Sequence, residues 1–278
     1  MSTLNAILRS VFDAALFPFR ELHPLIGLAV VSLVFGIAVL LVYKVTSNQE
    51  KLTAVKRRIH AGIFEIRLFN DSLRAIMRAM GGILRHNLTY LRLSAVPLLW
   101  MIAPLVLVIA QLQFHYGYQG LTPGDDALLK VQIAGDWTSD GAHPRLDLEV
   151  PSGVAIDSGP VWIPSLGEMT WRISAEEWGN HQLTLVTDDG PLTKSLSVSN
   201  AVVRRSTHRL APGFFNQLLY PAEDPIPGSS PVQSILLTYP AGNAGIEGWE
   251  SEWTWMLVFF ILSVVFAFAL RKPLNVTI

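Results

Sequence analysis

The feature that most constrains this chain is a basic segment, Lys44–Arg92, that lies between two long apolar stretches. Each stretch, His23–Tyr43 before it and Leu93–Phe114 after it, is long enough to cross a membrane as a helix. Acidic residues in the segment are few: Glu50, Glu65 and Asp71. Because short loops rich in Lys and Arg stay in the cytoplasm, the segment is predicted to be cytoplasmic. This sets the direction of both spans.

The basic segment also carries a heptad pattern, with apolar residues recurring at alternating steps of three and four. These seam residues are Leu52, Val55, Ile59, Ile66, Phe69, Leu73, Ile76, Met80 and Ile83. Gly62 falls on the same seam and is expected to weaken it. Both spans meet the same membrane face, so the segment must turn back, and Asn70-Asp71-Ser72 near its midpoint favours a turn. The pattern therefore predicts an antiparallel, coiled-coil-like helical hairpin; a break at Gly81-Gly82 is the alternative.

The regions predicted to lie on opposite sides of the membrane differ in charge. Half of the residues are hydrophobic, which is high for a soluble protein. Acidic residues dominate the region from Gly117 to Glu252, opposite in character to the basic segment. The chain has no cysteine, so that region must be stabilised by a core rather than by disulfides.

The ends of the chain complete the predicted topology. Residues 4–19 have one apolar and one polar helical face, which favours an interfacial amphipathic helix; a core helix docked on the rest of the protein is the alternative. The third span, Trp253–Leu270, begins among tryptophans and is followed by Arg271-Lys272. The predicted division is an interfacial helix over residues 1–22, spans over 23–45, 93–114 and 253–270, a cytoplasmic hairpin over 46–92, an extracytoplasmic domain over 117–252 and a cytoplasmic tail over 271–278.

The extracytoplasmic region reads as an all-β sandwich of immunoglobulin-like architecture, because short β-prone runs recur along it. These runs are Ala127–Ala134, Arg145–Val150, Met169–Ser174, His181–Thr187, Thr193–Ser199 and Val232–Tyr239. Gly179-Asn180 and Asp189-Gly190 are the predicted turns. A proline-rich loop, residues 204–231, interrupts the pattern. Its apolar cluster is the candidate outer-loop contact, Phe214, Phe215, Leu218 and Leu219; it either enters the outer leaflet or caps the sandwich, and capping is the preferred interpretation.

We find no catalytic constellation in the sequence. The histidines are scattered without the spacing of metal ligands, and no nucleophile elbow, phosphate-binding loop or dinucleotide fingerprint is present. The sequence therefore predicts a protein that is not an enzyme and that has no catalytic residues, cofactor or metal.

The basic hairpin has three interpretations: a topology signal that contacts anionic lipid, a docking arm for a cytoplasmic partner, or a site for nucleic acid such as ribosomal RNA. DNA is not an expected partner. The candidate contact residues are Lys51, Lys56, Arg57, Arg58, Arg67, Arg74, Arg78 and Arg85.

This layout resembles the YidC/Oxa-type membrane insertase superfamily, and especially its minimal three-span branch, which includes the insertase subunit of the eukaryotic ER membrane complex and archaeal relatives. The resemblance covers residues 20–114 and 253–272. It rests on Tyr43–Asn48 leading into the hairpin, on Lys56-Arg57-Arg58, and on the return into Leu93–Phe114. Two features differ from that family: no Arg or Lys lies at mid-depth in the spans, and a β domain separates the second span from the third.

The resemblance implies a role in membrane protein biogenesis or envelope organisation, with a nascent membrane protein or the ribosome at the hairpin. The layout is also similar to that of bacterial envelope proteins, which implies the bacterial inner membrane, with the N-terminus and β domain outside and the hairpin and C-terminus in the cytoplasm. The alternative function is a membrane anchor that presents a β-sandwich to an extracytoplasmic protein or glycan.

Overall fold

The structure is a computed structural model that describes residues 2–135 and 145–276. Residues 136–144 of the predicted outer domain, and 277 and 278 of the predicted tail, lie outside the described part. The chain divides into two compact units. The β unit comprises the chain up to Leu28 together with Leu107–Val258, and the helical unit comprises Ala29–Val106 together with the chain from Phe259 onward.

Two helices are long and apolar enough to cross a membrane, α2 (Pro24–Thr46) and α4 (Leu73–Tyr116). A core helix of a soluble protein is mostly buried, but only 28% of the α2 window and 11% of the α4 window are buried. Pro97 and Pro104 lie inside α4 without ending it. A third apolar helix, α6 (Thr254–Leu270), is shorter, at 17 residues. By length, composition and low burial, α2 and α4 could therefore be membrane spans.

In the helical unit, α2 and α6 pack closely at a small residue. A Cβ at Gly36 would lie 3.2 Å from the carbonyl oxygen of Ser263, so glycine allows the two backbones to approach. Phe35 stacks near Phe259, with ring centroids 5.2 Å apart. At the other end of this pair, Leu40 and Tyr43 of α2 form a buried cluster that α4 also contacts.

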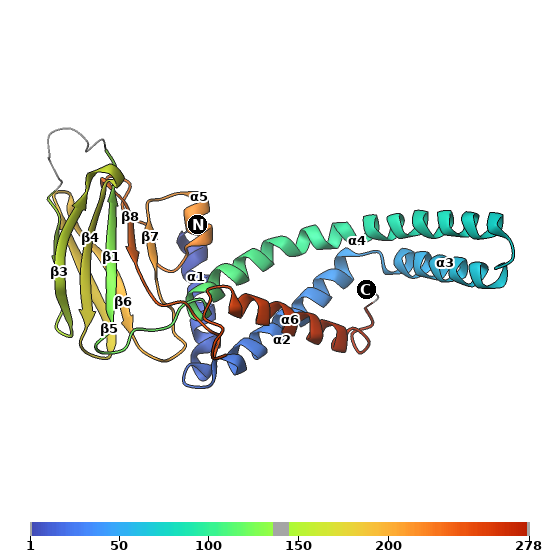
Figure 1. Cartoon of the computed structure of the whole chain (residues 1–278), viewed down its shortest axis with the longest axis horizontal. Coiled ribbons are helices and arrows are strands. Elements are labelled where there is room, and N and C mark those ends of the chain that lie inside the picture. The colour runs from blue at the N-terminus through green and yellow to red at the C-terminus, as the bar shows by residue number, and fades with distance from the viewer. Residues whose placement is uncertain (1, 136–144, 277–278) are drawn as a thin grey trace. The chain divides into compact units, whose positions relative to one another are not determined.

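The β unit contains two antiparallel sheets, neither of them closed (Figure 1). Its strands are β1 (Asp126–Ile133), β2 (Asp147–Glu149), β3 (Val154–Ile163), β4 (Glu168–Ala175), β5 (Gly179–Thr187), β6 (Gly190–Val198), β7 (His208–Leu210) and β8 (Val232–Leu237). The larger sheet has the order β3-β4-β1-β8-β7, and the smaller has β2-β5-β6. The predicted combination of long apolar helices with antiparallel sheets is thus confirmed.

One hydrophobic core joins both sheets. Val131, Trp171 and Ile235 from the larger sheet and Leu183 and Leu196 from the smaller sheet belong to the same buried cluster. In β1 the buried positions alternate with more exposed ones, as expected for a strand with one face on a core. A short connecting helix, η2 (Pro164–Leu166), joins β3 to β4.

Two details of the predicted β pattern are wrong. Gly179-Asn180 is not a turn: it begins β5 and pairs with Val198 and Ser197. Two strands, β3 and β7, lie in segments where no strand was expected. A tight turn does join β5 to β6, but one residue earlier than the predicted Asp189-Gly190: Asp188 and Asp189 form it, and Gly190, with a φ of 119°, begins β6 and pairs with Thr187.

The β unit also carries three helical pieces: α1 (Ser2–Leu16), η1 (Phe17–Phe19) and α5 (Phe214–Leu219). α1 and α5 are in contact. The side-chain amide of Asn5 donates a hydrogen bond of 2.6 Å to the carbonyl oxygen of Gln217. A helix from the start of the chain is thereby joined to the proline-rich loop.

Candidate functional site

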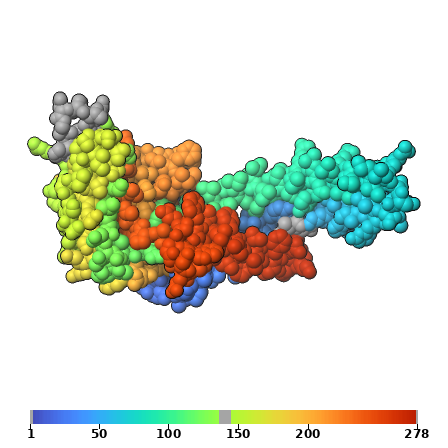
Figure 2. Space-filling view, in the orientation of Figure 1, coloured from blue at the N-terminus to red at the C-terminus, as the bar shows by residue number. Residues whose placement is uncertain are grey.

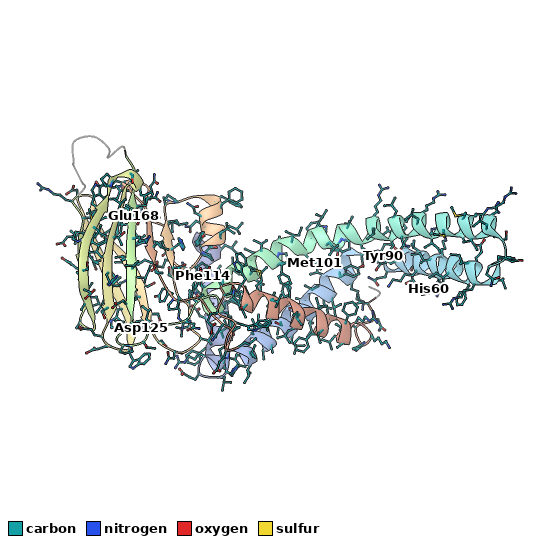
Figure 3. The ribbon with its side chains drawn as sticks, in the orientation of Figure 1. His60, Tyr90, Met101, Phe114, Asp125 and Glu168 are labelled. Atoms are coloured by element: carbon teal, nitrogen blue, oxygen red, sulfur yellow. The ribbon has the colours of Figure 1, made fainter. Side chains whose placement is uncertain are left out.

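The hairpin turns where the sequence predicts it. Its first arm is α3 (Gln49–Leu68), and the second is the first half of α4, which begins at Leu73. The Asn48 side chain caps α3 by accepting a hydrogen bond from the Lys51 backbone N–H at 3.0 Å. Gly81-Gly82, the alternative break, lies inside α4. In Figure 3, His60 on α3 and Tyr90 on α4 mark the two arms.

The seam between the arms differs from the heptad prediction on the α4 side. Ala79 is buried at 4% exposure, whereas Met80 is 54% exposed, and Phe69 and Leu73 at the turn are also exposed. On α3, Leu52 and Val55 are buried as expected. The α4 seam therefore runs through Ala79 instead of Met80, because a small residue lets paired helices approach.

Gly62, which was expected to weaken the seam, lies where the two arms approach closely. A Cβ at Gly62 would lie 2.7 Å from Cγ1 of Ile83 and 3.8 Å from the carbonyl oxygen of Ala79. Glycine thus provides the space that Ile83 occupies. This close packing acts against the cost of glycine's lower intrinsic helix propensity.

The large apolar residues left outside the seam form a continuous stripe on α4. We call this the hairpin stripe; its members are 54–74% exposed and are Leu73, Met77, Met80, Leu84, Leu88 and Leu91. They recur at steps of three and four, so they share one side of the helix, over about 27 Å at 1.5 Å per residue. Near the turn, Phe64 and Leu68 of α3 are also exposed. The heptad prediction missed this stripe because it assigned Leu73 and Met80 to the seam.

Seven of the eight candidate basic residues are exposed on the hairpin, and the eighth, Lys56, is partly buried. The Lys56 ammonium lies 5.5 Å from the centroid of the Tyr90 ring. Burial, and then the nearby Arg271 charge, lower the pKa of Lys56. On α4, Arg74, Arg78 and Arg85 recur at steps of four and seven, and therefore follow a line of their own beside the hairpin stripe. The exposed part of α4 consequently has an apolar line and a cationic line. In Figure 2 the two arms lie against each other along the hairpin.

The candidate outer-loop residues lie on α5, but they do not cap the sandwich. Phe214, Phe215 and Leu219 are 60%, 71% and 52% exposed, and Leu218 is partly buried. The buried side chain of α5 is instead Gln217, at 7% exposure. The preferred interpretation from sequence was wrong because α5 packs through its polar side. Apolar character alone does not show which side of so short a helix faces the core.

A buried ion pair holds the proline-rich loop against β6. The Lys194 ammonium, 2% exposed, donates to Glu223 Oε2 at 2.7 Å and to Ser206 Oγ at 2.8 Å. Glu223 Oε1 also accepts from the backbone N–H and the hydroxyl of Ser195. Ser206 beside a lysine has the composition of a nucleophile and base, but it is 4% exposed and its lysine is occupied by a carboxylate. The cluster therefore holds the proline-rich loop in place and is not arranged as a catalytic site.

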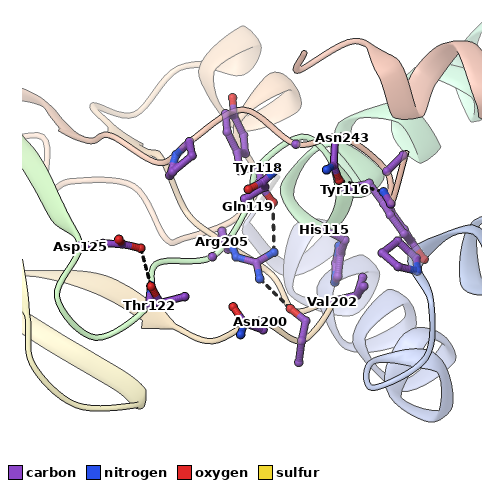
Figure 4. A pocket seen from close by; sticks show the side chains of 17 residues that line it. His115, Tyr116, Tyr118, Gln119, Thr122, Asp125, Asn200, Val202, Arg205 and Asn243 are labelled. Atoms are coloured by element: carbon purple, nitrogen blue, oxygen red, sulfur yellow. Dashed lines mark hydrogen bonds between the residues drawn. The ribbon is translucent and has the colours of Figure 1, made fainter. Parts of the chain in front are cut away.

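Arg205 lines a cavity of about 370 Å³ in the β unit (Figure 4). Its guanidinium donates to the carbonyl oxygens of Tyr118, Ser199 and Ala201 at 3.1, 2.9 and 2.6 Å. Burial lowers the pKa of Arg205 to about 10. These bonds to backbone show that Arg205 braces the loops around the cavity through both of its terminal guanidinium nitrogens.

Within residues 2–135 and 145–276 there is no group of three or more His, Asp or Glu side chains placed to hold a metal ion. No family model, curated protein or solved structure matches this chain. The hairpin brings an apolar stripe and exposed basic residues together on one element, and this makes it a candidate binding site.

Proposed function

We propose that this chain is a non-enzymatic integral membrane protein of insertase-like build, and that its hairpin receives apolar segments of nascent membrane proteins. The observation that carries the proposal is the hairpin stripe, a row of large, exposed apolar side chains beside exposed arginines. Its direction along α4 supports the proposal, since the same helix continues into the apolar stretch that begins at Leu93.

The proposed membrane arrangement has three spans, in α2, α4 and α6. The basic hairpin and the C-terminus lie in the cytoplasm, and the N-terminus and β unit lie outside, across the bacterial inner membrane. The charge division supports this orientation. Two antiparallel sheets with a shared core support an immunoglobulin-like sandwich for the β unit. Layout, rather than a diagnostic motif, supports kinship with the three-span branch of the YidC/Oxa superfamily.

A topology signal alone does not account for the stripe. Positive charges are sufficient to keep a loop in the cytoplasm, whereas exposed apolar surface costs about 25 cal/mol per Å² in water. Contiguous exposed apolar patches on soluble parts of proteins mark interaction sites. An apolar nascent segment fits the stripe, while the arginines fit anionic lipid headgroups or the phosphates of ribosomal RNA.

The proposal is tested by photocrosslinking in native membranes that contain ribosomes translating a membrane protein. A photoreactive residue at Leu84, 72% exposed on the stripe, should capture nascent chains. The matched control is Ile83, its neighbour in sequence, which packs against Gly62 on the seam. Equal capture at both positions, or capture of lipid alone at Leu84, would contradict the proposal.

The alternative function is an anchor that presents the β unit to an extracytoplasmic protein or glycan. The observation that favours it is β3, the edge strand of the larger sheet, where residues 156–161 are exposed in succession. Ile156 and Val161 are 41% and 55% exposed there. Loss of membrane protein insertion on replacing stripe residues, with the β unit unchanged, would decide against the anchor.

A further inference from the structure

The N-terminal helix α1 docks on the β unit by its polar side. Asn5 is 4% exposed and bonds to the carbonyl oxygen of Gln217. Arg9 forms an ion pair of 2.5 Å with Asp224. These contacts face the protein, although polar residues of a surface helix normally face water.

Asp13, two turns further from Asn5, completes the docking. Its carboxylate lies 2.7 Å from a guanidinium nitrogen of Arg204 and 3.0 Å from Nε2 of His115. Burial by itself raises the pKa of Asp13, but the hydrogen bond from His115 and the charge of Arg204 outweigh it and lower that pKa. The carboxylate therefore stays ionised at neutral pH, and α1 is held by charge-assisted bonds.

The opposite side of α1 is apolar and uncovered. Leu4, Ile7 and Val11 are 43%, 56% and 56% exposed, and they follow one another at steps of three and four. Phe17, just after the helix, is 61% exposed. Leu16, at the end of the helix, is buried at 2% exposure, so the uncovered face is the one formed by Leu4, Ile7 and Val11. On that face α1 has the reverse of the arrangement that a protein surface in water favours, because polar residues of the helix contact protein while these large apolar residues are exposed.

We infer that this outward face of α1, defined by Leu4, Ile7 and Val11, lies in the outer leaflet of the membrane at the headgroup boundary. In this position α1 would hold the β unit against the lipid surface through its polar side. The inference rests on the proposed membrane span in α2 and names the lipid contact of the β unit.

The chain itself argues for lipid as the occupant. Only residues 17–23 separate α1 from α2, and seven residues reach about 25 Å at most. A helix tethered this closely to a spanning helix lies near the bilayer surface. Trp249 and Trp253 belong to the same unit and precede α6, which begins at Thr254. They are 53% and 68% exposed, as tryptophans are at a membrane interface. The apolar face contains no charge that would select a soluble partner.

The test uses single cysteines in the full chain, which has none of its own. A bimane label is placed at Val11 on the apolar face, at Ser10 as the control, and at Val34, an exposed residue of α2. Ser10 and Val11 are both exposed and are separated by about 100° around the helix. The labelled chains are reconstituted in phosphatidylcholine–phosphatidylglycerol vesicles that contain lipids brominated along the acyl chain.

Brominated lipid should quench the Val11 label several-fold more than the Ser10 label, and iodide in the water should do the reverse. Equal quenching at Val11 and Ser10, or quenching of Val11 by iodide alone, would overturn the inference. Self-quenching that grows with protein density at Val11 would also overturn it, since a second copy would then cover the face. The Val34 label separates the two claims: if lipid quenches Val34 but not Val11, only the inference fails, and if it quenches neither, the proposed span fails as well.

Discussion

At the residue scale, we expect the buried ion pair of Lys194 and Glu223 to stabilise the β unit, and Gly62 to allow the hairpin arms to pack. Lys194 is fully surrounded by protein, and its charge is balanced by Glu223. A buried charge that loses its partner costs far more than the pair contributes when intact. Gly62 is expected to matter for the stability of the hairpin, because Ile83 occupies the space that a side chain at position 62 would need.

Replacing Glu223 by Gln should lower the free energy of unfolding of the β unit by about 3–5 kcal/mol, because it leaves the Lys194 ammonium buried without a carboxylate. Thermal unfolding of the full chain in detergent, followed by tryptophan fluorescence, measures the change. Glu149→Gln, at an exposed acid on β2, is the control and should change little. Similar losses in both variants would show that the ion pair has no special role.

The same ion pair predicts a pH dependence. Burial raises the pKa of Glu223, but Lys194 and the hydrogen bonds from Ser195 outweigh it and hold that pKa below its ordinary value. A depressed carboxyl pKa stabilises the fold above the unfolded pKa of about 4.3, and this stabilisation is lost as pH falls through the folded pKa. The wild-type protein should therefore lose more stability than Glu223→Gln between pH 6 and pH 3. Parallel pH profiles would contradict the assignment.

Gly62→Leu should separate the hairpin arms and destabilise them by about 1–3 kcal/mol, as overpacking does in cores. The same substitution at Gly81, where an added Cβ meets nothing within 4 Å, should instead stabilise α4 by about 0.5–1 kcal/mol through helix propensity. Hydrogen exchange of the α3 amides distinguishes the two. Unchanged protection of α3 in Gly62→Leu would mean that the arms are not packed at this position.

At the element scale, α1, α5 and the hairpin part of α4 carry large apolar residues outward although they lie outside the proposed membrane spans. In each case a polar or small residue is buried against protein, namely Asn5 in α1, Gln217 in α5 and Ala79 in α4, and in α1 the apolar Leu16 is buried as well. A helix that turns apolar groups away from its own protein needs another apolar surface. For α1 this surface is assigned to the outer leaflet, and for the hairpin stripe to a client segment.

The double variant Phe214→Ser and Phe215→Ser should change the free energy of unfolding by no more than about 0.5 kcal/mol, because both rings are exposed and leave no cavity. The control is Ile226→Ala in the same loop. Ile226 is 1% exposed within the shared core, so its truncation should cost about 2–5 kcal/mol. A loss of that size in the double variant would restore the capping role that the exposures exclude. Thermal unfolding of the full chain measures both.

At the scale of the whole molecule, the basic hairpin and the acidic β unit predict opposite sides of a membrane. A single cysteine at Ser158, exposed on β3, should react with a membrane-impermeant maleimide in spheroplasts. A cysteine at Ser72, in the exposed hairpin turn, should react only after the cytoplasmic face is opened. The reverse pattern would overturn the proposed orientation, and reaction of both in intact spheroplasts would show that the two parts do not lie across a barrier.

Local pattern in the sequence was sufficient for the long helices, the hairpin turn at Asn70-Asp71-Ser72 and most strands. Hydropathy over twenty residues, helix-capping side chains and alternation of apolar residues act within one segment and need no partner. The strand β3 was missed because it does depend on a partner. Its sequence contains Gly159 and Pro160, which are poor strand formers, and only its pairing with β4 makes it a strand.

The direction in which each apolar face points was decided by tertiary structure alone. The periodicity of α4 is compatible with a seam through Met80 or through Ala79, which lie about 100° apart on the helix, and the fit of Ile83 against Gly62 selects Ala79. The amphipathic pattern of α1 is identical whether its polar side faces water or protein. Partners distant in sequence, Gln217, Asp224, Arg204 and His115, draw that side inward. The sequence by itself thus determined which helices are apolar and where the chain turns, while burial of complementary polar groups, a property of the assembled fold, decided which apolar surfaces are left exposed.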